Sequence, residues 1–259
     1  MNIISWETLQ NQQDFGDEPI AATIGVFDGV HIGHRALIRE ITTTEKSLHP
    51  LVITFRENPS QILRSEKYRG DIYTLEQKLE AFEQLGVETT VLIDFSHDFS
   101  KLSGRDFIFT VYNSVNLTLL VLGKNFRCGK NADTTAEMVR HYLYNSRCEV
   151  RVLEQVTAAG VPVSSTIIRE MILQGELDKI DRLLGSKYTV DLRNVEKENH
   201  NANTTIKRVH IRQLLPPLGT YSVILKNENS EKESYLHISD NNVAFHEPEN
   251  FTATQLRFI

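Results

Sequence analysis

The first 185 residues alternate between short apolar runs and longer stretches whose apolar residues recur at helical spacing. Runs of four to eight apolar residues are typical of buried strands, and the longer stretches are typical of amphipathic helices. This alternation predicts an α/β fold with a doubly wound, mostly parallel sheet that carries helices on both faces. The predicted strands are residues 20–24, 51–55, 87–95, 117–122 and 149–153. The predicted helices lie at 34–47, 74–86, 134 to about 145, 165–174 and 177–184, and another begins at Ser103 and carries Phe107, Ile108 and Val111 on one face.

The composition changes after residue 185. Residues 194–205 are polar and charged, which predicts a linker or an exposed loop. Short alternating segments follow, separated by turns rich in Asn and Ser, and they predict a small β domain built from hairpins. The sequence therefore predicts two domains, residues 1–185 and 186–259, with the later strands at 221–225, 235–238, 243–245 and 252–259.

A glycine-rich turn follows the predicted strand at residues 20–24 and leads into a helix. Glycine lets backbone N–H groups approach a phosphate closely, and a helix N-terminus favours negative charge. His31 and His34 stand three residues apart at this point and can donate hydrogen bonds to phosphate oxygens. The simpler alternative is a glycine-rich turn that carries two solvated histidines.

Charge and cysteine content narrow the classes of function. The net charge is −6, so a nucleic-acid backbone or an anionic membrane is not expected as a general partner. Cys128 and Cys148 show no CxxC spacing, which fits a reducing compartment. The N-terminus has no signal-peptide pattern and no apolar run reaches a membrane-spanning length, so we expect a cytoplasmic protein.

Two motifs in a fixed order carry a family resemblance. H-x-G-H at His31–His34 is followed by S-S-T-x-I-R at Ser164–Arg169, and this pair resembles the nucleotidylyltransferase superfamily. The longer text G-V-F-D-G-V-H-I-G-H resembles the FMN adenylyltransferase module of the prokaryotic riboflavin kinase/FAD synthetase family. The resemblance covers about residues 20–188. It implies a Rossmann-like fold and transfer of AMP from ATP to FMN, giving FAD and pyrophosphate, with Mg²⁺ accompanying ATP.

The resemblance also implies roles for particular residues. Such a transfer needs no side-chain nucleophile, because the FMN phosphate already carries anionic oxygens, so the protein must align two polyanions and neutralise charge. T-F-R-E-N-P at residues 54–59 and G-K-N-F-R-C-G-K at residues 123–130 resemble the family's flavin-binding segments. The implied catalytic residues are His31, His34 and Arg169; those for ATP are Gly25, Phe27, Asp28, Gly29, Gly33, Ser164, Ser165 and Thr166; those for flavin are Asn58, Pro59, Asn125, Phe126 and Arg127. No protein ligand for a metal is implied.

Three residues depart from the family pattern on the flavin side. Glu57 stands where proline is usual, Cys128 replaces an aromatic residue, and Thr134 replaces a glycine. Weaker or altered selectivity for the acceptor is a possible consequence. We expect Cys128 to be a buried neutral thiol.

The C-terminal module departs further. Residues 183–190 and 214–223 resemble entries into the family's riboflavin kinase barrel, but the glycine-rich and P-T-A-N segments are absent between them. We therefore expect a shortened kinase-like domain without kinase activity.

Other hypotheses about the function remain open from the sequence alone. They are nucleotidyl transfer to another phosphorylated acceptor, non-catalytic flavin or nucleotide binding, and a bifunctional enzyme. Each serine of the S-S-T motif could also be a plain helix cap. The sequence does not indicate an oligomeric state.

Overall fold

The computed structural model describes residues 1–11, 15–44, 47–200 and 203–259, which form two compact units. The first unit comprises residues 1–68 and 78–162, and the second comprises residues 69–77 and 163–259. The predicted domain boundary after residue 185 does not coincide with this division, because the last two predicted helices and the segment 69–77 belong to the second unit.

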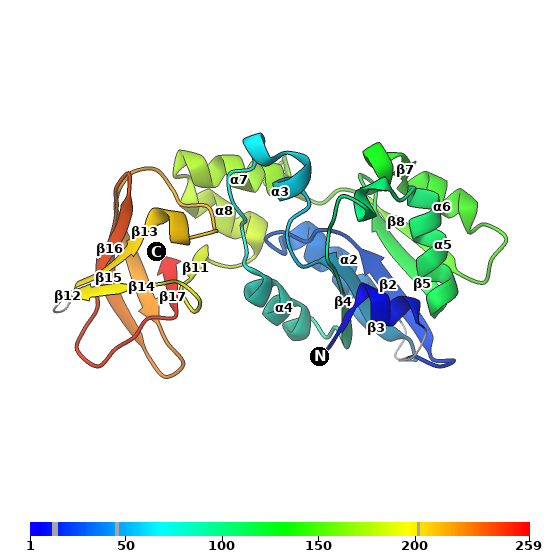
Figure 1. Cartoon of the computed structure of the whole chain (residues 1–259), viewed down its shortest axis with the longest axis horizontal. Helices are drawn as coiled ribbons and strands as arrows, with labels where there is room; N and C mark the ends of the chain where they lie inside the picture. The colour runs from blue at the N-terminus through cyan, green and yellow to red at the C-terminus, as the bar shows by residue number, and fades with distance from the viewer. Residues whose placement is uncertain (12–14, 45–46, 201–202) are drawn as a thin grey trace. The chain divides into compact units, whose positions relative to one another are not determined.

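The first unit is built on a six-stranded sheet in which every neighbouring pair is parallel (Figure 1). The strand order is β1-β4-β3-β2-β5-β8. The chain fills one side of β2 first and then returns to its other side, so the order reverses at β2. The strands are β1 (Asn2–Ser5), β2 (Pro19–Ile24), β3 (His49–Phe55), β4 (Thr89–Ile93), β5 (Asn116–Gly123) and β8 (Glu149–Leu153).

All five predicted strands of this sheet are present, which confirms the predicted α/β class. The sequence analysis missed β1 and the helix α1 (Trp6–Gln10) that follows it directly. β1 has four residues, two of them exposed, so it lacks the apolar run of a buried strand. It is a strand because it pairs with β4 at the edge of the sheet, which is a tertiary contact.

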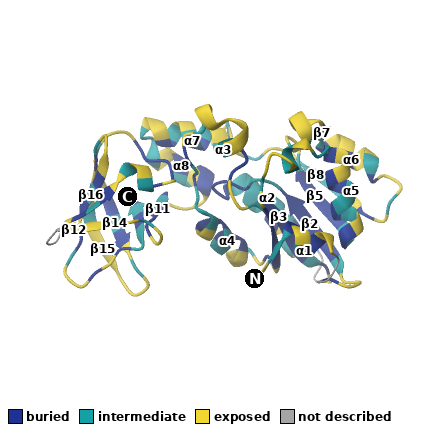
Figure 2. Cartoon of the chain, in the orientation of Figure 1, coloured by how far each residue is buried: buried dark blue, intermediate teal, exposed yellow. Residues whose placement is uncertain are grey.

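Helices cover the sheet on both faces. Ile20, Ala22 and Ile24 alternate along β2 and join one apolar cluster with buried residues of α1, α5 and α6. Helix α2 packs on β2, β3 and β5, and its buried Ile38 and Ile41 lie outside that cluster. The central strands between these layers are buried (Figure 2). The helices are α2 (Ile32–Thr43), α3 (Ser60–Leu63), α4 (Leu75–Gln84), α5 (Gly104–Ser114) and α6 (Ala136–Tyr142), with α4 beginning in the second unit.

Local signals fix several helix ends. Ser103 caps α5 by accepting from the backbone N–H of Asp106, and Thr135 caps α6 in the same way. Thr74 and Gln77 form a capping box before α4, since each backbone N–H donates to the other's side-chain oxygen.

The second unit contains two helices and an antiparallel sheet. The helices α7 (Ser165–Gln174) and α8 (Leu177–Leu184) have the predicted bounds, and each ends at a glycine with positive φ. The sheet order is β11-β17-β14-β15-β16-β13-β12. Its strands are β11 (Thr189–Asp191), β12 (Glu198–His200), β13 (Asn203–Lys207), β14 (Gly219–Lys226), β15 (Glu231–Ile238), β16 (Asn242–His246) and β17 (Gln255–Phe258).

One prediction for the second unit is wrong. Residues 194–205 were predicted to be a linker or an exposed loop, but β12 and the start of β13 form an antiparallel pair there. Thr204 is buried and bonds the buried carboxylate of Glu247, so long-range pairing overrides the polar composition. Residues 201 and 202 lie outside the described part of the chain. Across the described residues, no helix is both long and apolar enough to cross a bilayer.

The segment at residues 69–77 is held within the second unit by a buried amide. The Nε2 atom of Gln213 donates to the carbonyl of Ile72 at 2.8 Å and to Oε1 of Gln77 at 3.0 Å. Asp71 bridges to Gln213 through backbone bonds. This network explains why a segment from the middle of the first predicted domain belongs to the second unit.

Candidate active site

The glycine-rich turn lies where β2 ends, at the point where strand order reverses. We call residues 25–34 the H-x-G-H turn. Ligands of such sheets bind at the carboxyl ends of the strands beside this point. β2 has β3 on one side and β5 on the other, so the loops that follow these three strands share one edge of the sheet. These loops are the H-x-G-H turn, residues 56–59 and residues 123–130.

The backbone of the H-x-G-H turn is tightly constrained. Phe27 and Val30 have φ of 53° and 35°, which is costly for residues with a side chain. The backbone N–H of Val30 donates to the carbonyl of Phe27 at 3.2 Å, and that of Gly25 donates to Ile53 on β3 at 3.1 Å. Both strained residues are fully buried, so packing holds the conformation in place.

His31 is the N-cap of α2. Its Nδ1 atom accepts a hydrogen bond from the backbone N–H of His34 at 3.2 Å. Burial lowers the pKa of His31 to about 4 from an ordinary 6.5, partly offset by a backbone hydrogen bond. The imidazole is therefore neutral at pH 7. Because Nδ1 is an acceptor, the single ring proton is on Nε2, which leaves an N–H donor at the N-terminus of α2.

The two imidazoles stack on each other. Their ring centroids are 3.5 Å apart with 14° between the planes. A Cβ atom at Gly33 would lie 3.2 Å from the ring of His31, so the absence of a side chain there allows the close approach. The edge of Phe27 also meets His34, with centroids 5.1 Å apart. The turn thus fixes both rings beside the positive end of a helix, where an anionic oxygen is stabilised.

The loop after β3 carries two of the predicted flavin residues. Asn58 and Pro59 are both buried, and the Oδ1 atom of Asn58 accepts from the backbone N–H of Ser60 at 3.1 Å. Pro59 precedes α3. Glu57, one of the departures from the family pattern, is exposed. The side chain of Asn58 therefore helps to shape this loop, as an Asx-turn does.

The loop after β5 carries the other three. Asn125 and Arg127 are exposed, whereas Phe126 is half-buried and packs against the apolar cluster under the sheet. The Nδ2 atom of Asn125 donates to Oε1 of Gln155 at 3.3 Å. Asn125 and Arg127 are accessible to a ligand, and Phe126 has a packing role in addition to any contact with flavin.

The remaining departures, Cys128 and Thr134, face each other across a two-stranded pair formed by β6 (Arg127–Cys128) and β7 (Thr134–Thr135). Burial raises the pKa of Cys128 to about 12, and Asp133 adds to this shift, which supports a neutral thiol; the residue is half-buried, not buried as predicted. Thr134 is buried against Gly104, where a Cβ atom would overlap it. The bulkier residue at 134 is thus matched by a glycine at 104.

The S-S-T segment belongs to the second unit, where it opens α7. Ser164 is the N-cap, and its Oγ atom accepts from the backbone N–H of Ile167 at 3.3 Å. Ser165 and Thr166 are the first two residues of the helix, and Arg169 follows one turn later. The capping role of Ser164 considered from the sequence is therefore present.

Comparison with known proteins decides the family. A family model described as FAD synthetase matches residues 14–167, which is more than half of the chain. The chain belongs to the FAD synthetase family.

Relatives of this FAD synthetase-family chain carry a second activity in their names. It is similar to the bifunctional riboflavin kinase/FMN adenylyltransferases of Listeria monocytogenes (31% identity over 207 residues, 77% of this chain and 66% of that protein) and Bacillus subtilis (30% over 210 residues, 77% and 65%). The Escherichia coli K12 protein of the same description is 24% identical over 221 residues, covering 83% and 71%. The match spans slightly less than two thirds of the length of the first two.

A solved structure shares the fold over the whole chain. A crystal structure described as a macrolide-efflux protein from Streptococcus pneumoniae aligns with a TM-score of 0.82 at 23% identity, covering 100% of this chain and 89% of that one. At this identity the likeness shows the fold alone.

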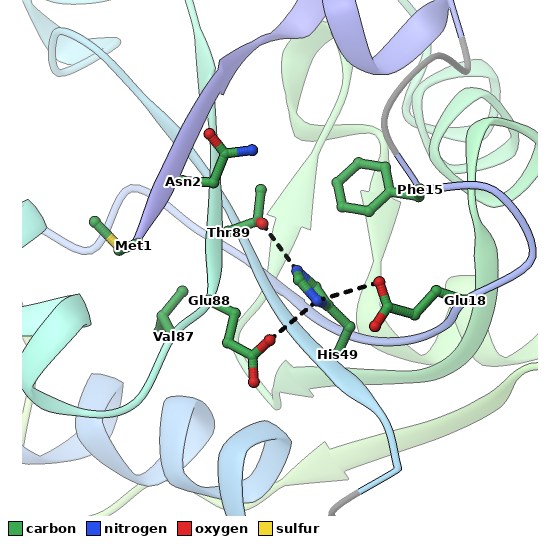
Figure 3. Close-up of a pocket in the computed structure, with 8 residues that line it drawn as sticks. All are labelled: Met1, Asn2, Phe15, Glu18, His49, Val87, Glu88 and Thr89. Atoms are coloured by element: carbon green, nitrogen blue, oxygen red, sulfur yellow. Dashed lines mark hydrogen bonds and ion pairs between the residues drawn. The ribbon is translucent and has the colours of Figure 1, made fainter.

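The opposite edge of the FAD synthetase-family sheet has a pocket of about 410 Å³ (Figure 3). It lies at the amino ends of the strands, where His49 begins β3. The Nε2 atom of His49 is 2.8 Å from Oγ1 of Thr89. The Nδ1 atom of His49 is 3.4 Å from a carboxylate oxygen of Glu18 and 3.2 Å from one of Glu88. These polar groups bind one another. Within the described residues, no group of three His, Cys, Asp or Glu side chains could hold a metal ion.

Two contacts of the H-x-G-H turn were not predicted. The Nε atom of Arg35 donates to the carbonyl of Val30 at 3.0 Å, and the ammonium group of Lys78 reaches the carbonyl of Val26 at 3.5 Å. Neither residue belongs to a motif in the sequence. Both act on backbone carbonyls, which leave no pattern of residue types.

Proposed function

We propose that this chain is an FMN adenylyltransferase that transfers AMP from ATP to FMN. A phosphate oxygen of FMN attacks the α-phosphorus of ATP in line, the bond to the bridging oxygen of pyrophosphate breaks, and pyrophosphate leaves with that electron pair. The observation that carries the proposal is the neutral, buried His31, with its Nε2–H donor at the N-terminus of α2, in a chain of the FAD synthetase family.

The residues of the H-x-G-H turn have complementary roles in this proposal. His31 and His34 would donate to phosphate oxygens as negative charge builds on the α-phosphate and the leaving group. Gly29, with φ of 81°, and Gly33 would give backbone N–H groups access to the triphosphate. Gly25, Phe27 and Asp28 complete the ATP side. Mg²⁺ would arrive bound to the triphosphate and neutralise charge there.

The remaining predicted residues belong to the S-S-T-x-I-R segment and to the two loops on the flavin side. Ser164, Ser165, Thr166 and Arg169 would bind the other phosphates, with Arg169 as the catalytic cation. Asn58, Pro59, Asn125, Phe126 and Arg127 would line the flavin side, because their loops follow strands that flank β2. An amide such as Asn125 can donate to and accept from the polar edge of a flavin.

We also propose that riboflavin kinase activity is absent, although the relatives are named for both activities. The support is that the glycine-rich and P-T-A-N motifs are absent from the sequence. The β12–β13 pair occupies the part of the chain where these motifs would be expected. The C-terminal sheet would then serve a structural role. A cytoplasmic location also remains a proposal from composition.

One assay tests both proposals. The protein is incubated with Mg-ATP and either FMN or riboflavin, and the flavins are resolved chromatographically. FAD formed from FMN alone supports both proposals, and FMN formed from riboflavin would overturn the loss of kinase activity. Saturable quenching of flavin fluorescence without any product would instead favour a binding protein.

A further inference from the structure

Lys78 places a buried charge under the H-x-G-H turn. Its side chain on α4 is only 7% exposed, and lysine is almost never buried unless its ammonium group is paired. The ammonium donates to the carbonyl of Phe55 at 2.6 Å and lies 3.3 Å from Oγ1 of Thr54 and 3.5 Å from the carbonyl of Val26. All three acceptors are uncharged. These three contacts connect the ammonium of Lys78 to two backbone segments.

The two segments are the ends of neighbouring strands. Val26 directly precedes the strained Phe27 of the H-x-G-H turn, and its carbonyl also accepts from the hydroxyl of Thr54 at 3.1 Å. Phe55 is the last residue of β3 and directly precedes the loop that holds Asn58. One cation thus ties the turn assigned to ATP to the loop assigned to flavin.

A second residue of α4 supports the same turn. Phe82 lies one helical turn after Lys78 and therefore on the same face. Its ring meets Phe27 edge to face, with centroids 5.5 Å apart, and Phe27 in turn meets His34 at 5.1 Å. α4 therefore holds the turn through one polar and one apolar contact, and the apolar one leads to a predicted catalytic ring.

We propose that Lys78 is a positioning residue for nucleotidyl transfer, which fixes the H-x-G-H turn relative to the loop after β3 by binding the carbonyls of Val26 and Phe55. The catalytic part of this inference rests on the proposed function. In-line transfer requires the attacking oxygen and the α-phosphorus to be aligned, and a misplacement of about 1 Å can cost on the order of 10²-fold in rate. Lys78 acts through the backbone of both loops and need not touch either substrate.

The decisive variant is Lys78→Met, which keeps a long unbranched side chain and removes the ammonium. Methionine fills a similar volume, but the carbonyls of Val26 and Phe55 lose their charged donor and are no longer held together by it. We therefore expect kcat to fall by about 10- to 100-fold, while KM for ATP and for FMN changes by less than about threefold. Lys101→Met is the matched control, because Lys101 is exposed and pairs with Asp98 on the surface.

Folding is followed by the fluorescence of Trp6, the single tryptophan, which is buried in the first unit. A kcat within about twofold of the wild type, in a Lys78→Met protein that Trp6 fluorescence shows to be folded at the assay temperature, would overturn the inference. If Lys78→Met does not fold, Thr54→Val takes its place, since it removes the hydroxyl that links Lys78 to Val26. We expect a fall in kcat of about 3- to 10-fold, and an unchanged kcat would contradict the inference.

Amide hydrogen exchange separates this inference from the proposed function. If the wild type makes no FAD from FMN, the proposed function fails, but the turn can still be examined. The N–H groups of Gly25 and Val30 are bonded within the structure that Lys78 supports. We expect both to exchange at least about tenfold faster in Lys78→Met than in Lys101→Met. Equal exchange in the two variants would show that Lys78 does not position the turn.

Discussion

The buried imidazole of His31 should make the stability of the first unit depend on pH. Its pKa is lowered to about 4 in the folded chain, against an ordinary 6.5 in the unfolded chain. Between these values the unfolded chain binds a proton that the folded chain does not. Protonation of His31 in the unfolded chain therefore lowers the free energy of unfolding. This loss is small above pH 6.5, grows as the pH drops toward 4, and does not grow further below pH 4.

The size of the effect follows from the same two values. From pH 6.5 to pH 5 only the unfolded chain is protonated at this site, and each pH unit corresponds to about 1.36 kcal/mol. The free energy of unfolding should thus fall by about 2 kcal/mol between pH 7 and pH 5 on account of His31 alone. His31 is 6% exposed, so solvent screens this effect little.

The perturbation is His31→Asn, which keeps a side-chain acceptor for the N-cap of α2 and removes the titrating group. Urea unfolding is followed through Trp6 at pH 7 and pH 5. We expect the wild type to lose about 2 kcal/mol more than His31→Asn over this interval. His97→Gln is the control, because it removes an exposed imidazole from the same unit. An identical pH dependence in the wild type and His31→Asn would refute the argument that His31 is buried as the neutral form.

Three further predictions concern single sites. His34→Ala should keep the fold and lose about 10²–10³ in turnover with Mg-ATP and FMN; a wild-type rate would contradict its assignment as a phosphate donor. Cys128, with a pKa raised to about 12, should resist iodoacetamide at pH 8 in the folded protein and react after unfolding in urea, and rapid labelling of the folded form would count against a neutral thiol. Gly104→Ala should cost about 1–3 kcal/mol by overpacking against Thr134. The cost should fall in a Thr134→Gly background, leaving the part due to Oδ1 of Asp133, which would lie 2.8 Å from the new Cβ atom, and an equal cost in both backgrounds would show that Thr134 is not an obstacle.

Local features of the sequence were sufficient for much of the fold. Strand β8 and helices α7 and α8 have the predicted bounds, because apolar periodicity, N-cap residues and terminal glycines act over a few neighbouring residues. The family could also be recognised from the sequence, because the H-x-G-H and S-S-T-x-I-R motifs combine residue types that bind phosphate.

Other parts of the fold depend on contacts between residues that are distant in the chain, so only the tertiary structure shows them. β1 exists through its pairing with β4, and β13 pairs with β16 about forty residues further along the chain, although neither β1 nor β13 has a strong apolar pattern. The segment 69–77 joins the second unit through Gln213, more than a hundred residues away.

The sequence by itself determined which groups are available to the candidate site: two imidazoles, the glycines beside them and a helix that begins there. The tertiary structure decided their state. His31 is neutral because other parts of the chain exclude water from it, and Lys78 reaches two carbonyls because α4 packs beneath the turn. Desolvation and long-range hydrogen bonds depend on residues far apart in the chain, so no local pattern of residue types records them.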